Sequence, residues 1–109
     1  MLVDFNQICT DLKGEKYPDI LERIANALID PYFMIGSPTK RGDLARDIYK
    51  KGKIEIDHED LKIVRQAIEF TNPKEPLVSL PILVKNVLLK YLDNLKEDNT
   101  KKDDAKKDK

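Results

Sequence analysis

The residues that could do chemistry in this chain are few: one histidine, one cysteine and scattered carboxylates. His58 lies in the string Asp57-His58-Glu59-Asp60, whose side-chain types all occur as metal ligands. It has no second ligand four residues later. Acidic residues are also expected at the start of a helix, where they accept from free N–H groups and suit the helix dipole. We therefore interpret Asp57 as a helix N-cap and predict no metal site.

Cys9 is the other candidate for chemistry, and it lies between Ile8 and Thr10. A reactive thiolate needs a base or a cation nearby, and the sequence places none beside it. We interpret Cys9 as a small buried side chain. The phosphate-loop patterns GxGxxG and GxxxxGK[ST] are absent from the sequence, as are CxxC and HExxH. The sequence thus predicts no catalytic residue, no cofactor and no enzymatic activity.

A local excess of positive charge lies in residues 40–53. Its members are Lys40, Arg41, Arg46, Lys50, Lys51 and Lys53, opposed by Asp43 and Asp47. This segment is either a solvated helix face or a contact for phosphate or an acidic partner through Lys40, Arg41, Arg46 and Lys50. The second interpretation makes a small DNA-binding regulator the alternative function. The whole chain has 20 basic and 20 acidic residues, and this balance argues against a general nucleic-acid binder.

Residues 80–92 form the most apolar run, but Lys85, Asn86 and Lys90 interrupt it and it is too short to cross a bilayer. We therefore predict no membrane partner. The segment MLVDFNQ lacks the basic region, apolar run and cleavage site of a signal peptide. The single Cys9 cannot form an internal disulfide. We expect a cytoplasmic protein.

Four amphipathic segments predict helices at residues 18–29, 40–51, 58–71 and 79–95. Thr39 or Ser37 could cap the second helix, and Gly52 is expected to end it in a left-handed conformation. The fourth helix is expected to begin with Ser79 as its N-cap. Its apolar stripe runs through Leu80, Val84, Val87, Tyr91 and Leu95, and Leu83, Leu88 and Leu92 widen it.

The segment Lys53-Ile54-Glu55-Ile56 alternates like a short strand, and its expected mate is the N-terminal arm around Phe5 to Leu12. The predicted fold is mainly α: a small four-helix domain with a minimal two-stranded β element, about 3–12 with 53–56. Residues 1–95 form this single domain. Residues 96–109 carry six lysines, five acidic residues and one apolar residue, so we predict a disordered tail.

Two apolar surfaces are candidates for contact with another protein. The loop at residues 31–39 carries Tyr32, Phe33, Met34 and Ile35, which either fold over the core or face a partner. The other is the edge of the last helix formed by Ile82 and Leu89, which three partner helices leave uncovered. The leading hypothesis is a non-enzymatic protein–protein interaction module that binds another protein, itself, or both.

The order of motifs also resembles a family of small proteins. A start with DLKG (11–14) is followed by NAL (26–28), LARDIY (44–49) and IEIDHEDLKIV (54–64), and then by the apolar C-terminal helix. The chain is similar in this order, over roughly residues 5–92, to small helical proteins encoded by tailed phages and prophages. Such proteins are found among virion and tail-morphogenesis genes, so the resemblance implies contact with phage structural or assembly proteins, in the host cytoplasm or the virion. It implies no catalytic residue.

Overall fold

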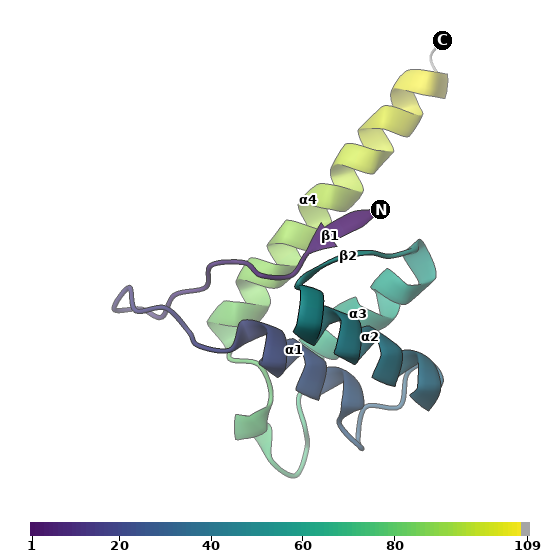
Figure 1. Cartoon of the computed structure of the whole chain (residues 1–109). Helices are drawn as coiled ribbons and strands as arrows, with labels where there is room; N and C mark the ends of the chain where they lie inside the picture. Colours follow the sequence, from purple (N-terminus) through teal and green to yellow (C-terminus); the bar gives the residue numbers. More distant parts are fainter. Residues whose placement is uncertain (108–109) are drawn as a thin grey trace.

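A computed structural model describes the backbone of residues 1–107 and the side chains of residues 1–77 and 79–95. The elements run in the order β1 (Leu2–Asp4), α1 (Ile20–Ile29), α2 (Pro38–Lys51), β2 (Lys53–Glu55), α3 (His58–Glu69), the 3-10 turn η1 (Pro76–Val78) and α4 (Ile82–Lys107). Helices α1 to α3 group together, with α4 and the two strands beside them (Figure 1). The predicted mainly α fold with a small two-stranded sheet is confirmed. The predicted disordered tail, residues 96–109, lies outside the residues whose side chains are described.

Local chemistry at the helix ends explains most of these boundaries. The Ser37 hydroxyl accepts a hydrogen bond from the Lys40 N–H, and the Asp57 carboxylate accepts one from the Asp60 N–H, so both act as N-caps. Gly52 ends α2 at φ 70°, a backbone conformation that other residues avoid. Helix α1 begins at Ile20 rather than at residue 18, because Asp19 has a left-handed conformation with φ 56°.

The sheet is shorter and lies earlier in the chain than predicted. Strand β1 pairs antiparallel with β2, with Val3 opposite Ile54. The Phe5 N–H still donates to the Gly52 carbonyl at 2.8 Å, but there the pairing stops. Residue 52 belongs to the turn that ends α2, so no extended backbone remains to pair with residues 6–12. The expected partner segment around Phe5 to Leu12 was therefore wrong in register, although the pairing of the two segments was right.

The start of α4 also differs from the prediction. Ser79 does not cap the helix: its hydroxyl accepts a hydrogen bond from the Asn72 N–H at 2.7 Å, while α4 begins at Ile82. The first helical bond runs instead from the Lys85 N–H to the Pro81 carbonyl. The hydroxyl is occupied in the preceding loop, and the helix consequently starts three residues after Ser79.

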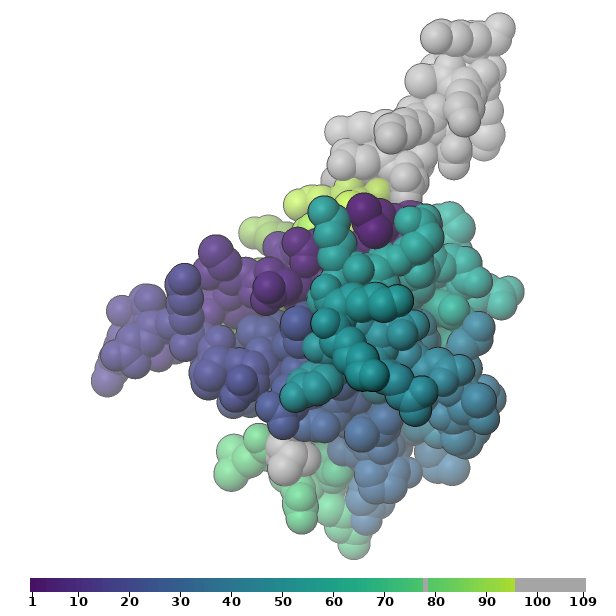
Figure 2. All heavy atoms as spheres, in the orientation of Figure 1, coloured from purple at the N-terminus to yellow at the C-terminus, as the bar shows by residue number. Residues whose placement is uncertain are grey.

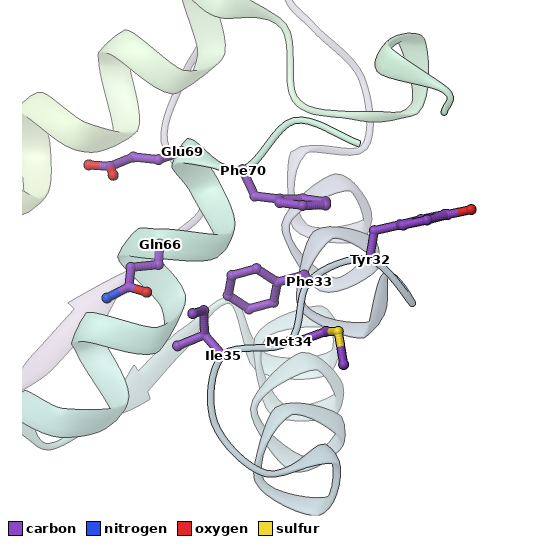
Figure 3. Close-up of a pocket in the computed structure, with 7 residues that line it drawn as sticks. All are labelled: Tyr32, Phe33, Met34, Ile35, Gln66, Glu69 and Phe70. Carbon is purple, nitrogen blue, oxygen red and sulfur yellow. The ribbon is translucent and has the colours of Figure 1, made fainter. Parts of the chain in front are cut away.

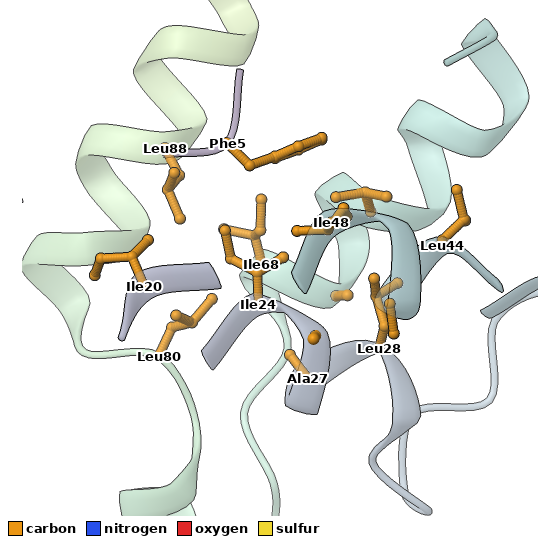
Figure 4. Packing of buried hydrophobic residues seen from close by; sticks show 14 of the residues in the cluster. Phe5, Ile20, Ile24, Ala27, Leu28, Leu44, Ile48, Ile68, Leu80 and Leu88 are labelled. Atoms are coloured by element: carbon orange, nitrogen blue, oxygen red, sulfur yellow. The ribbon is translucent and has the colours of Figure 1, made fainter. Parts of the chain in front are cut away.

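Helix α4 supplies one wall of the core. The residues of α4 and its approach that are fully buried recur every four positions: Leu80, Val84, Leu88 and Leu92. Figure 4 shows Leu80 and Leu88 within a cluster that includes Ile24 of α1 and Ile68 of α3. Val87 and Tyr91 are only partly buried at its margin, and the Tyr91 hydroxyl accepts from the Asp4 N–H at 3.0 Å. The buried face of α4 therefore runs through Leu88 and Leu92 rather than through Val87 and Tyr91 of the predicted stripe.

Candidate protein-contact site

The loop between α1 and α2 divides its apolar side chains between the core and the surface. Phe33 is 3% exposed and belongs to the core, whereas Met34 is 79% exposed. Tyr32 and Ile35 are both exposed by nearly half. Phe33 therefore folds over the core and anchors the loop, while Tyr32, Met34 and Ile35 face outward.

These four side chains line an open pocket of about 620 Å³ together with Gln66, Glu69 and Phe70 of the α3 end (Figure 3). The floor is aromatic, because the Phe33 and Phe70 rings lie 5.5 Å apart at an interplanar angle of 58°. That tilted geometry is favourable for an aromatic pair. The pocket is thus an apolar depression whose rim carries the exposed Met34 side chain.

The loop is pressed onto α3 at Gly36. This residue has φ 78°, and a Cβ added there would lie 2.9 Å from the Ile63 Cδ1 atom. Glycine is favoured here by the backbone conformation, whereas the added Cβ would meet only the flexible end of the Ile63 side chain. The contact fixes one side of the pocket against α3.

Arg41 of α2 holds the loop from the opposite side. Its guanidinium donates to the Phe33 carbonyl and, at 3.4 Å, to the Leu28 carbonyl at the end of α1. The guanidinium carbon also lies 5.8 Å from the centroid of the Phe33 ring, within range of a cation–π contact. Arg41 is therefore bound to the fold, and its guanidinium is not presented to a phosphate group.

The other candidate basic residues do not converge on one spot. Lys40 forms an ion pair with Asp60 at 3.2 Å. Arg46 is exposed and lines a separate groove between α1 and α2, while Lys50 is exposed on α2. Arg41 is thus bound within the fold and Lys40 is paired with Asp60, so that only Arg46 and Lys50 of the four are exposed without a described partner.

A second bracing network joins the loop to the segment that precedes α4. Asn72 is buried, and its side-chain N–H donates to the Asp30 carboxylate at 2.8 Å. Its carbonyl oxygen accepts from the N–H groups of Lys74 and Glu75, and the other Asp30 oxygen accepts from the Tyr32 N–H. The loop and the segment around η1 consequently lie at the same end of the molecule (Figure 2).

The candidate edge on α4 is less continuous than predicted. Ile82 is 74% exposed in the first turn of the helix. Leu89, two turns later, is only partly buried but packs against the core cluster. The two residues therefore do not make one open apolar strip, and Ile82 alone stands clear of the domain.

Two titratable side chains of the described part of the chain have shifted pKa values, Cys9 and Lys85. Burial raises the pKa of the Cys9 thiol, which opposes formation of a reactive thiolate. Burial lowers the pKa of Lys85 while Glu69 acts against that shift, and the ammonium donates to the Glu69 carbonyl and the Thr71 hydroxyl. Lys85 thus caps the end of α3. No group of three or more His, Cys, Asp or Glu side chains among the described residues is arranged to hold a metal ion.

The four loop residues that line the pocket are candidates from the sequence, whereas the residues that shape the pocket were not predicted. Phe70, Arg41 and Asn72 were not predicted to take part. A signal for Phe70 existed, because it is an aromatic residue at the end of an amphipathic helix just before the Asn72-Pro73 break. Nothing in residues 40–53 distinguishes the inward Arg41 from its exposed neighbours.

Comparisons with known proteins give no assignment: no family model matches the chain, and neither does a curated protein or a solved structure. Within the described residues, no helix is sufficiently long and apolar to span a bilayer. The site geometry is therefore the basis on which a function can be argued.

Proposed function

We propose that this chain is a non-enzymatic protein–protein interaction module and that it serves in the assembly of a tailed-phage or prophage particle. Its contact surface is the apolar pocket formed by Tyr32, Phe33, Met34 and Ile35 with Phe70. The assembly role rests on the resemblance of its motifs to small phage-encoded proteins. The contact role rests on the pocket itself.

The observation that carries the contact role is the exposure of Met34 beside an aromatic floor. An exposed apolar side chain alone is common on protein surfaces. Here Tyr32, Met34 and Ile35 are exposed next to the buried Phe33. All four residues line one depression rather than a convex surface. Apolar pockets of this kind provide the anchor sites of protein interfaces, where burial of a few side chains contributes most of the affinity.

The pocket is also held in place before any partner arrives. Arg41 fixes the Phe33 carbonyl, Gly36 packs onto Ile63, and Asn72 fixes Asp30. A braced site loses less conformational entropy when it binds than a mobile loop does. The bracing therefore favours a binding role for the exposed residues.

The test is affinity capture with the full chain as bait, in cells that express its gene and its neighbouring genes. The wild type is compared with Met34→Lys and with Leu12→Lys, since Leu12 is 92% exposed but lies outside the pocket. We expect the same identified partner, or the chain itself, to be recovered with wild type and Leu12→Lys and to be lost with Met34→Lys. Equal recovery with all three baits would refute the assigned surface.

A DNA-binding assay on the same proteins tests the alternative function, that of a small DNA-binding regulator. If the exposed Arg46 and Lys50 contact phosphates, affinity should fall with salt by roughly 0.9 log units per log unit of salt for each phosphate neutralised. The proposal expects no such complex at low salt. If a complex with DNA forms, is lost in the double variant Arg46→Gln, Lys50→Gln and is kept in Met34→Lys, DNA binding replaces the proposed function.

A further inference from the structure

We draw no further inference here: the strongest candidate, the open groove between α1 and α2 whose lining includes Ala25, Ile29, Gly42, Ala45 and Tyr49, carries nothing because nothing in the structure shows what covers it.

Discussion

Replacing Arg41 with methionine tests whether this residue braces the site or serves an external ligand. The guanidinium donates to the Phe33 carbonyl and to the Leu28 carbonyl, and it lies over the Phe33 ring. Methionine keeps much of the aliphatic packing of arginine but supplies no donor and no charge. The substitution therefore removes the bracing interactions and keeps a side chain that reaches as far as the position of the arginine Nε.

The size of the effect follows from those contacts. A hydrogen bond from a charged donor contributes about 1.5–3 kcal/mol. The bond to Leu28 is long at 3.4 Å and adds little, whereas the cation–π contact adds about 0.5–1 kcal/mol. Opposing this, the Arg41 Nε atom is buried without a hydrogen-bond partner among the described residues, and its removal relieves a cost of about 1 kcal/mol. The free energy of unfolding should fall by about 1–3 kcal/mol.

Urea unfolding followed by circular dichroism measures this difference, and Lys40→Met is the matched control. Lys40 is the adjacent basic residue, but its ion pair with Asp60 is partly solvated and should contribute no more than about 1 kcal/mol. We expect a clearly lower unfolding midpoint for Arg41→Met than for Lys40→Met. Equal stabilities of Arg41→Met and wild type, within about 0.5 kcal/mol, would refute the bracing role.

Three further substitutions test other parts of the fold. Leu88→Ala should lower the free energy of unfolding by ~2–5 kcal/mol, because this core side chain is 1% exposed; a folded variant of unchanged stability that loses its oligomer would contradict this placement. Asn72→Ala removes three hydrogen bonds of a buried amide and should cost about 1–3 kcal/mol in urea unfolding, and no loss of stability would argue against the network. Because the pKa of Lys85 is lowered in the folded state, the folded chain loses the Lys85 proton at a lower pH than the unfolded chain does. The free energy of unfolding should therefore rise as the pH approaches 10.5, and Lys85→Met should flatten that rise. Parallel pH profiles of wild type and Lys85→Met would contradict this role of Lys85.

Helix periodicity and capping chemistry were sufficient to predict the fold class. Asp57 and Ser37 cap their helices with bonds to residues three positions later, which is a purely local relation. The positive φ of Gly52 at the end of α2 is likewise a local feature. Such features can be predicted from sequence because their partners are close along the chain.

The features that were missed depend on partners beyond the three- or four-residue range of helix capping. Ser79 has the right chemistry for an N-cap, but the Asn72 N–H takes its hydroxyl. The Arg41 side chain turns inward because the Phe33 carbonyl, eight residues earlier, is placed beside it by the packing of α1 against α2. The N-terminal strand stops at Asp4 because β2 begins directly after Gly52. No local pattern distinguishes these outcomes from their alternatives.

The most direct test of the contact surface is an NMR measurement on the two methionine methyl groups. The chain has two methionines, Met1 and Met34, so selective ¹³C-methyl labelling gives two assignable signals. Spectra are recorded as the chain is concentrated, and again with any partner recovered by affinity capture. We predict that association shifts or broadens the Met34 signal and leaves the Met1 signal in place. If a mass measurement detects association while the Met34 signal is unchanged, the proposed contact surface is wrong.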